Sequence, residues 1–492
     1  MQIDHSNPVQ TLGSCSQSAK SNQPIVTSSG VELLSFPSTN TQQNELPNEA
    51  FIGAQDFSLP PVDHGKAAWL CLLGSFVLEM AVWGFPFSFG VLQDYYTSTE
   101  PFSHNTSGVS VVGSCCMVCK PWNLCSGVCT ILTIHKGVLY LASPISLFIL
   151  QRWPHLCRMS SLAGLAISVV GLLSSSFATQ VWQLIVTQGI IYPIGACMLY
   201  YPVLIFIDEW FVQKKGFAYG VCWAGSGVAG TIFPFLIRWA LSRFFFKVTM
   251  WAWCVGMILL VCPFLPFVKP RIRVGAAQAP RPQQLSFKFL RSRPFIIFQL
   301  GSFLQSLGYF APSLYLPTYS RVVANGSSFG STAPLTSLNA GTIIGFILIG
   351  HFIDRWRVEN VIFISTICTL LGVFVIWGLS ISLPPLCVFA LLYGVFAGSS
   401  SATWPGIVLA VRKADDTAPV GLVLGLFTAS RGVGSIACGP ISSALIDSKW
   451  PWAGNPSGMG YGTIFGGLIV FTGVTASFGT LGFAAKRSGF LY

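Results

Sequence analysis

The chain has 492 residues, of which 52% are hydrophobic and only 9% are charged, and its formal net charge is +11. Soluble domains carry about 25% charged residues, so this composition excludes a protein whose surface mostly faces water. A net positive charge is also compatible with nucleic-acid binding, and the placement of the charges along the chain has to decide that question.

Residues 1–62 form the first distinct segment. They are rich in Ser, Asn, Gln and Pro, and Lys20 is their only Lys or Arg. The segment has neither the basic start nor the apolar core of a signal peptide. Its composition predicts a disordered cytoplasmic tail.

Twelve apolar runs follow, and most are close to the ~20 residues that an α-helix needs to cross lipid. We expect them near 67–92, 108–150 (interrupted), 160–178, 182–206, 216–240, 249–268, 295–318, 333–353, 361–380, 384–410, 418–446 and 461–484. In lipid a helix satisfies its own backbone hydrogen bonds, which an isolated strand cannot do. The sequence therefore predicts an all-α polytopic membrane protein.

The basic residues gather in connections that lie inside if the N-terminus is cytoplasmic. Seventeen Lys and Arg fall in predicted inner connections after the first helix, against four in outer ones. The outer four are Arg243, Lys247, Arg321 and Lys449. Both predicted glycosylation acceptors, Asn105 and Asn325, also fall in outer loops. The charge therefore sets the membrane topology, with cytoplasmic termini, and nucleic acid is not the expected partner.

The second run is interrupted by Val118 to Lys136, with the sequence VCKPWNLCSGVCTILTIHK. One interpretation is a zinc site. Its ligands would be Cys116, Cys119, Cys125, Cys129 and His135. A second is an extramembrane insertion. The third, which we favour, is a translated intron, because deleting the segment joins GVSVVGSCCM to GVLYLASPISLFIL in one continuous apolar helix. The nineteen codons can also encode an intron donor, branch point and acceptor.

The longest polar interruption between spans, Lys269 to Arg293, carries seven basic residues and divides the runs into six and six. After the eighth span comes GHFIDRWR (350–357), and Arg152 stands at the equivalent place after the second. With this layout the chain resembles the major facilitator superfamily. The resemblance implies two six-helix bundles, expected at 63–268 and 294–485, that rock about a midplane site. Residues 486–492 would form a short cytoplasmic tail.

The charged signature at the cytoplasmic ends of these spans has an expected role in gating. Asp354, Arg355 and Arg357, with Arg152, can bridge the two halves and hold one state of a transport cycle. The alternative is that these arginines are ordinary topological anchors.

Two further stretches resemble the monocarboxylate porter family, most closely its fungal branch. They are DHGKAAW, which begins at Asp63, and WFVQKKGFAYG, which contains Lys214 and Lys215. The resemblance implies a porter of small organic anions that is often proton-coupled. The lysine that animal lactate porters keep after Phe-Pro is Phe87 here, and residues 335–349 lack their Asp–Arg pair. Lactate is therefore not the expected solute.

Three charges lie inside predicted spans, where an ionisable group costs at least about 2.5–3.5 kcal/mol. Glu79, the only acidic residue deep in a span, is expected to carry a proton or contact solute. The alternative is a carboxyl that hydrogen-bonds a neighbouring helix. Arg431 suits a solute carboxylate, although it could instead pair with Glu79 or with the cytoplasmic loops. Arg238 lies near the outer end of its span, where snorkelling explains it most simply and solute contact is the alternative.

No H-E-x-x-H motif, Walker A loop or nucleophile elbow occurs, so we predict neither an enzyme nor a cofactor or metal. The sequence predicts a secondary transporter of a small organic anion, with protons as the coupling ion. The plasma membrane is the expected location and the vacuolar membrane the alternative. Export of a secondary metabolite and a non-transporting membrane sensor are the other functions considered. The sensor would need a long structured cytoplasmic extension, which neither tail predicts. The sequence does not specify substrate identity, direction or oligomeric state.

Overall fold

The computed structural model describes residues 60–98, 135–271, 286–324, 330, 332–448 and 450–490. Most of the predicted tail, residues 118–134, the centre of the basic linker and both glycosylation acceptors lie outside these described residues. From Ser58 onward the chain forms one unit. Its regular structure is entirely helical over the described residues.

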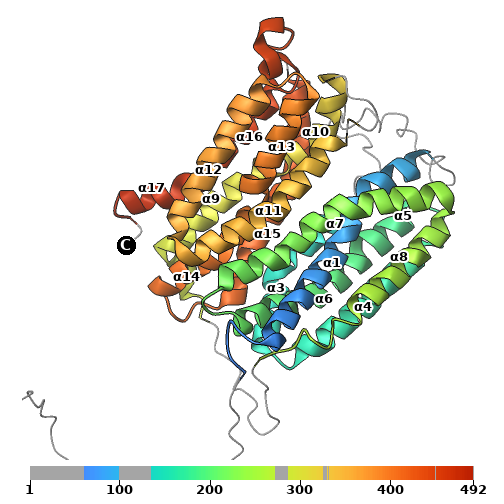
Figure 1. The fold of residues 1–492 in the computed structure, drawn as a ribbon, viewed down its shortest axis with the longest axis vertical. Helices are drawn as coiled ribbons and strands as arrows, with labels where there is room; N and C mark the ends of the chain where they lie inside the picture. The colour runs from blue at the N-terminus through green and yellow to red at the C-terminus, as the bar shows by residue number, and fades with distance from the viewer. Residues whose placement is uncertain are drawn as a thin grey trace, which may run out of the picture. The chain divides into compact units, whose positions relative to one another are not determined.

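Twelve helical rods can be followed in chain order through the described residues (Figure 1). The first six are α1 (Lys66–Ser98), a rod running from His135 into α3 (Ser143–Arg152), α4 (Leu156–Ser175), α5–η3–α6 (Val181–Leu184, Ile185–Ile191, Tyr192–Trp210), α7 (Lys215–Arg243) and α8 (Phe246–Val261). The last six are α9–α10 (Arg293–Tyr309, Ala311–Val322), α11 (Ala333–Arg355), α12–η5 (Val358–Leu371, Gly372–Trp377), α13–η6–η7–α14 (Leu383–Tyr393, Gly394–Gly398, Ser400–Thr403, Trp404–Ala414), α15 (Val420–Asp447) and α16–η9–α17 (Gly466–Ser477, Phe478–Thr480, Leu481–Arg487). The short helices η4 (Lys288–Arg291) and η8 (Pro456–Gly462) lie in connections.

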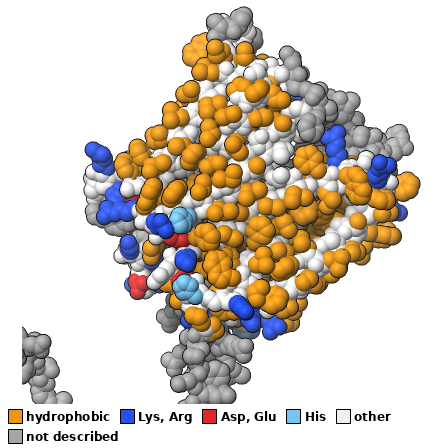
Figure 2. Space-filling view, in the orientation of Figure 1, with side chains coloured by type: hydrophobic (Ala, Val, Ile, Leu, Met, Phe, Trp, Pro, Cys, Tyr) orange, Lys and Arg blue, Asp and Glu red, His pale blue; other side chains and the backbone are white. Residues whose placement is uncertain are grey.

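The surface of these rods is suited to lipid. Within the described residues, nine rods are long and apolar enough to cross a membrane, and α8 is a shorter apolar helix. Ile145, Met159 and Leu259 have about two thirds of their side-chain surface exposed, at 65%, 65% and 68%. Figure 2 shows hydrophobic side chains across most of the visible face, with Lys and Arg gathered near its edges. This arrangement matches the predicted all-α membrane fold.

Prolines set where several rods end or break. The sixth run was expected to extend to residue 268, but α8 ends at Val261 because Pro263 and Pro266 follow. A proline lacks the N–H that continues a helix and clashes with the carbonyl four residues earlier. For the same reason the seventh rod breaks at Phe310, two residues before Pro312. The tenth rod changes to a 3-10 turn ahead of Pro405.

The two halves share one hydrophobic core, whose members in the second half lie toward the ends that follow the basic linker. Trp223 of α7, Phe346 of α11 and Trp404 of α14 belong to a single buried cluster. A second cluster, which includes Tyr319 and Trp377, involves only the last six rods at their opposite ends. The halves are therefore held together by apolar packing mainly at the ends that carry the basic linker, which the sequence predicts to be cytoplasmic.

Small residues let α7 and α11 approach closely where the halves meet (Figure 1). A Cβ added to Gly216 would lie 2.6 Å from the Gly350 carbonyl oxygen, and one added to Gly220 would collide with the Phe346 carbonyl. Farther along the same seam, the Asn339 amide donates a hydrogen bond to the Gly230 carbonyl at 3.0 Å. The seam is thus packed backbone against backbone, as small residues allow between membrane helices.

Candidate functional site

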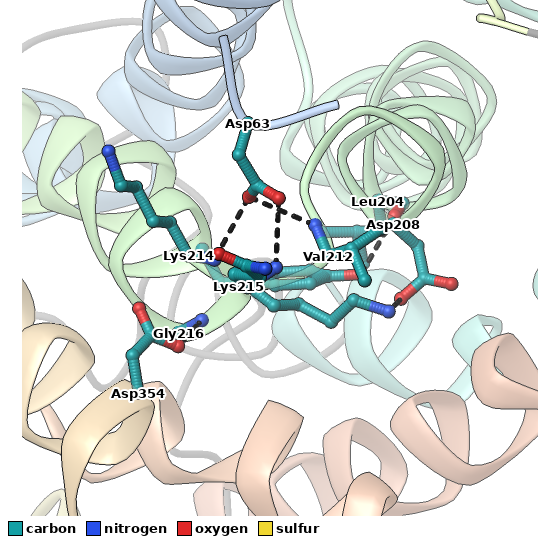
Figure 3. Close-up of polar contacts among 10 residues, drawn as sticks. Asp63, Leu204, Asp208, Val212, Lys214, Lys215, Gly216 and Asp354 are labelled. Carbon is teal, nitrogen blue, oxygen red and sulfur yellow. Dashed lines mark hydrogen bonds and ion pairs between the residues drawn. The ribbon is translucent and has the colours of Figure 1, made fainter. Parts of the chain in front are cut away.

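The connection between α6 and α7 is held by Asp63, which precedes α1 (Figure 3). The carboxylate accepts hydrogen bonds from the backbone N–H groups of Val212 at 3.1 Å, Gln213 at 3.0 Å and Lys214 at 2.9 Å. Asp63 is only 3% exposed, and its own N–H donates to the Trp210 carbonyl. Three donors on one carboxylate fix the position of this connection relative to α1.

A second carboxylate reaches the start of α7 from the other half of the molecule (Figure 3). Asp354, at the end of α11, accepts hydrogen bonds from the N–H groups of Gly216 at 2.6 Å and Phe217 at 2.8 Å. The first N–H groups of a helix lack intrahelical partners and carry partial positive charge, so they suit a carboxylate. We call this contact the latch: the Asp354 carboxylate with the N–H groups of Gly216 and Phe217.

The other signature residues are not part of the latch. Lys215 pairs with Asp208 of α6 at 2.5 Å, within its own half. Arg355 and Arg357 are exposed, and neither forms an ion pair with any residue in the described ranges. Arg152 is the last residue of α3 and is half-buried. The contact that this signature makes between the halves is formed by the Asp354 carboxylate and the backbone N–H groups of Gly216 and Phe217, and bridging by Arg152 stays a prediction.

The environment of Asp63 predicts a pH-dependent contribution to stability. Burial alone would raise the pKa of its carboxyl, but the three backbone N–H donors and His64 outweigh burial and hold that pKa below its usual value. A carboxyl with a depressed folded-state pKa stabilises the fold above its unfolded pKa of about 3.9, and this stabilisation is lost as pH falls through the folded value. We expect Asp63→Asn to unfold about 2–4 °C below the wild type at pH 7, with the difference closing below about pH 4. Thermal unfolding in detergent measures this; a difference unchanged down to pH 3 would contradict it.

The latch predicts that Asp354 keeps the end of α11 and the start of α7 together. Replacing Asp354 with Ala removes the acceptor of two backbone N–H groups across the seam, so the seam should open more often. We expect hydrogen–deuterium exchange to rise several-fold in peptides covering both 212–220 and 343–353. Asp416→Asn is the control, because Asp416 is an exposed carboxylate that pairs with Arg412 on the surface. Faster exchange in the first peptide alone would indicate a local cap that does not join the halves.

Deeper in the molecule, the Arg431 side chain of α15 is buried at 8% exposed. Its guanidinium donates to the hydroxyls of Ser400 at 2.7 Å and Ser401 at 3.3 Å. Its Cζ atom lies 4.2 Å from the ring centroid of Tyr309 and 4.9 Å from that of Trp404. These are cation–π distances. No carboxylate of the described residues forms an ion pair with Arg431.

Two helix breaks bring these partners to Arg431. Ser400 and Ser401 lie in the turn before Pro405, and Tyr309 is the last residue of α9 before the break at Phe310. The Tyr309 hydroxyl donates to the Gly398 carbonyl at 2.7 Å, which links the two breaks. Sequence reasoning missed the two serines. The run GSSSATWP, small polar residues ending in Trp-Pro inside an apolar span, was the signal that could have found them.

A small cavity of about 30 Å³ adjoins Arg431 within the second half, and its lining is mixed, with apolar side chains such as Ile297, Phe298 and Ile407 beside polar ones. Arg431 and Trp404 line it, together with hydroxyl and amide side chains. These are Ser302, Gln305, Ser365, Thr366, Ser400 and Thr403. The space is enough for a water molecule, and its lining supplies the polar partners that water needs. The buried guanidinium therefore adjoins a space that can hold water, although most of its lining surface is apolar.

Glu79 lies in the first half, on α1, and is 2% exposed. The Tyr200 hydroxyl of α6 and the Trp83 indole N–H lie close enough to interact with this carboxyl, although neither the Oε2 atom nor the indole nitrogen makes a hydrogen bond of regular geometry with the described residues. Glu79 does not pair with Arg431; Tyr140 lies within electrostatic reach of both charges. Arg238, by contrast, is exposed on α7. Two of the three predicted membrane charges therefore point into the interior, and the third does not.

The sequence is similar to those of a family of transport proteins. The sequence profile of the Major Facilitator Superfamily matches residues 126–439, more than half of the chain. The MFS-type transporter hasB of Aspergillus fumigatus is 27% identical over 85% of this chain and 88% of its own length. The Agnestins efflux protein AgnL12 of Paecilomyces divaricatus is 25% identical over 84% of this chain and 87% of its own length.

A solved structure supports the same fold. The human organic anion transporter MFSD10 (TETRAN) superposes with a TM-score of 0.60, covering 86% of this chain and 99% of its own, at 12% identity. The all-α fold predicted from sequence is confirmed by this likeness and by the profile match. The relatives are transporters and not enzymes. The chain is therefore an integral membrane transporter that belongs to the Major Facilitator Superfamily.

Proposed function

We propose that the chain is a secondary transporter of organic anions that works by alternating access between two bundles, residues 63–268 and 294–485. The observation that carries this proposal is the buried Arg431 guanidinium, which contacts hydroxyls and aromatic rings but no carboxylate of the described residues. A buried charge without a counter-charge is costly in a membrane protein. A solute carboxylate would supply the missing charge in a bidentate geometry.

Glu79 is the proposed proton carrier. Its carboxyl is buried and no cation of the described residues pairs with it, so protonation would remove a charge that no cation balances, and deprotonation would need help from solute or water. The resemblance to the monocarboxylate porter family, which includes Asp63 and the Lys214–Lys215 pair, supports proton symport. Arg238 is exposed and would act as an interfacial anchor.

The latch gives the proposed cycle its cytoplasmic gate. Asp354 and the shared hydrophobic core hold the cytoplasmic ends together, which corresponds to a state closed on that side. Breaking the latch would let the bundles rock open toward the cytoplasm. The linker 269–293 and the tail 1–62 would lie on the same side of the membrane.

Export of a secondary metabolite is the second candidate function. The similarity to the Agnestins efflux protein AgnL12 favours it. Direction in a secondary transporter follows the gradients of solute and coupling ion, so the same site serves either direction. The plasma membrane is the proposed location in both cases.

We also propose that Val118 to Lys136 is a translated intron. Lys136, the last residue of the segment, lies in the second rod, and its contact there is the Phe310 ring at 5.2 Å. Removing the segment would put Met117 directly before Gly137 and take this cation out of the span. Sequencing of transcripts across the junction tests the proposal; the segment in nearly all messages would contradict it.

The test of transport is flux in proteoliposomes, using the full chain and the form without Val118–Lys136. A panel of labelled organic anions and matched neutral alcohols is offered with and without an inward proton gradient. We expect anions to be accumulated and alcohols not. Equal movement of anions and alcohols, or no movement of any solute, would contradict the proposed function.

A further inference from the structure

Arg431 indicates that the solute is an anion, and the aromatic rings around Arg431 indicate a further property of the solute. Two runs of aromatic contacts extend from Arg431 into the first half. We call the residues in them the aromatic belt: Trp83, Tyr140, Phe310, Tyr309, Trp404 and Trp223. From the structure of this belt we infer that the transported anion carries a flat aromatic body next to its acidic group. This inference rests on the proposed function and names its substrate class.

One run passes from the seventh rod through the second rod to Trp83 on α1. The ring centroids of Tyr309 and Phe310 lie 4.7 Å apart, those of Phe310 and Tyr140 lie 6.4 Å apart, and those of Tyr140 and Trp83 lie 5.2 Å apart. Trp83 is one helical turn from Glu79 on α1. This run therefore joins the proposed anion site to the proposed proton site through aromatic contacts alone.

The other run passes through α14 and α7. The Trp404 ring, which lies over the Arg431 guanidinium, is 5.7 Å from the Trp223 ring in an edge-to-face contact. The Trp223 indole N–H donates to the Tyr200 hydroxyl at 2.7 Å, and this bond fixes the orientation of the ring. A ring held at its polar edge presents a fixed apolar face to its neighbours.

Two of these contacts join the two halves: Phe310 with Tyr140, and Trp404 with Trp223. In alternating access the halves separate around the site, so these are contacts that the cycle has to break. Each separated ring loses a partner that is worth about 0.5–1.5 kcal/mol beyond its buried area. An aromatic solute can replace the lost partner, whereas a short aliphatic acid leaves the ring faces uncovered.

Most of the surface of the belt is aromatic ring, and this also limits the kind of solute that fits it. Ligand sites that are mainly apolar, with a small number of placed polar groups, bind apolar bodies with one polar end. Here the anion-binding end is Arg431 with Ser400 and Ser401.

The test compares three probes of similar size in proteoliposomes: 2-naphthoate, decanoate and 2-naphthalenemethanol. For the wild type we expect 2-naphthoate to bind and to be taken up about tenfold better than decanoate, with the neutral alcohol poorest. Tyr309→Leu and Trp404→Leu should each reduce the advantage of naphthoate over decanoate several-fold. Phe363→Leu is the matched control, because Phe363 stacks on Phe483 at 4.1 Å away from the belt.

The outcomes separate the inference from the proposed function. Equal affinity for naphthoate and decanoate in the wild type overturns the aromatic specificity and leaves anion transport intact. A naphthoate preference that survives both belt variants, or that falls equally in Phe363→Leu, removes the belt as its source. Binding of neither acid, in the full chain and in the form without Val118–Lys136, overturns both.

Discussion

Replacing Arg431 with Gln is expected to reduce uptake of organic anions by at least about 100-fold. The substitution removes a cation that the structure buries among hydroxyls and rings, and with it the proposed counter-charge of the solute. Losing one partner of a buried charge pair costs about 2–5 kcal/mol, which is the basis of this magnitude. Uptake of labelled anion into proteoliposomes measures the loss, and thermal unfolding shows that the variant is folded.

Two further variants make this prediction specific. Arg431→Lys keeps the charge but loses the planar fork and its stacking on Tyr309 and Trp404, so we expect about tenfold weaker binding. Arg238→Gln removes the same charge from the exposed surface of α7 and should leave uptake unchanged. If Arg431→Gln and Arg238→Gln were equally active, Arg431 would be only a packing residue and the solute would bind elsewhere.

The helical fold could be predicted from the sequence because each membrane span is a local signal. A run of apolar residues about 20 long is sufficient to define a span, and the basic residues between runs define its orientation. The position of a break inside a span is determined less by the local sequence. Pro312 and Pro405 were visible as kinks, but the turn that forms before each depends on contacts such as the bond from Tyr309 to Gly398.

The candidate site, too, could be predicted only in part from local sequence. Glu79 and Arg431 were conspicuous because a charge inside an apolar run is costly, so each was expected to have a role. The partners of Arg431 come from rods far apart in sequence, and nothing local identifies Ser400 or Tyr309 as neighbours of residue 431. For Asp354 the motif indicated a bridge between the halves, yet its partners are backbone N–H groups, which no side-chain pattern records.

Replacing Glu79 with Gln is expected to abolish proton-driven accumulation while leaving solute exchange partly intact. The amide resembles a permanently protonated carboxyl, so the cycle with solute bound can proceed but no proton is released. With one proton per anion, a gradient of one pH unit is worth about 1.4 kcal/mol, so the wild type should accumulate its solute about tenfold. The variant should equilibrate at about equal concentrations inside and outside.

The matched control is Glu359→Gln, on α12. Glu359 is buried to 3% exposed, like Glu79, but its carboxylate pairs with Lys486 at 3.1 Å near the predicted cytoplasmic surface. Loss of that pair should lower stability and leave the pH dependence of uptake as in the wild type. Glu359 is paired with a cation, whereas no cation of the described residues pairs with Glu79. Glu79 is therefore the carboxyl that we expect to exchange a proton with solute in the site. An unchanged accumulation ratio in Glu79→Gln would mean that coupling passes through another group.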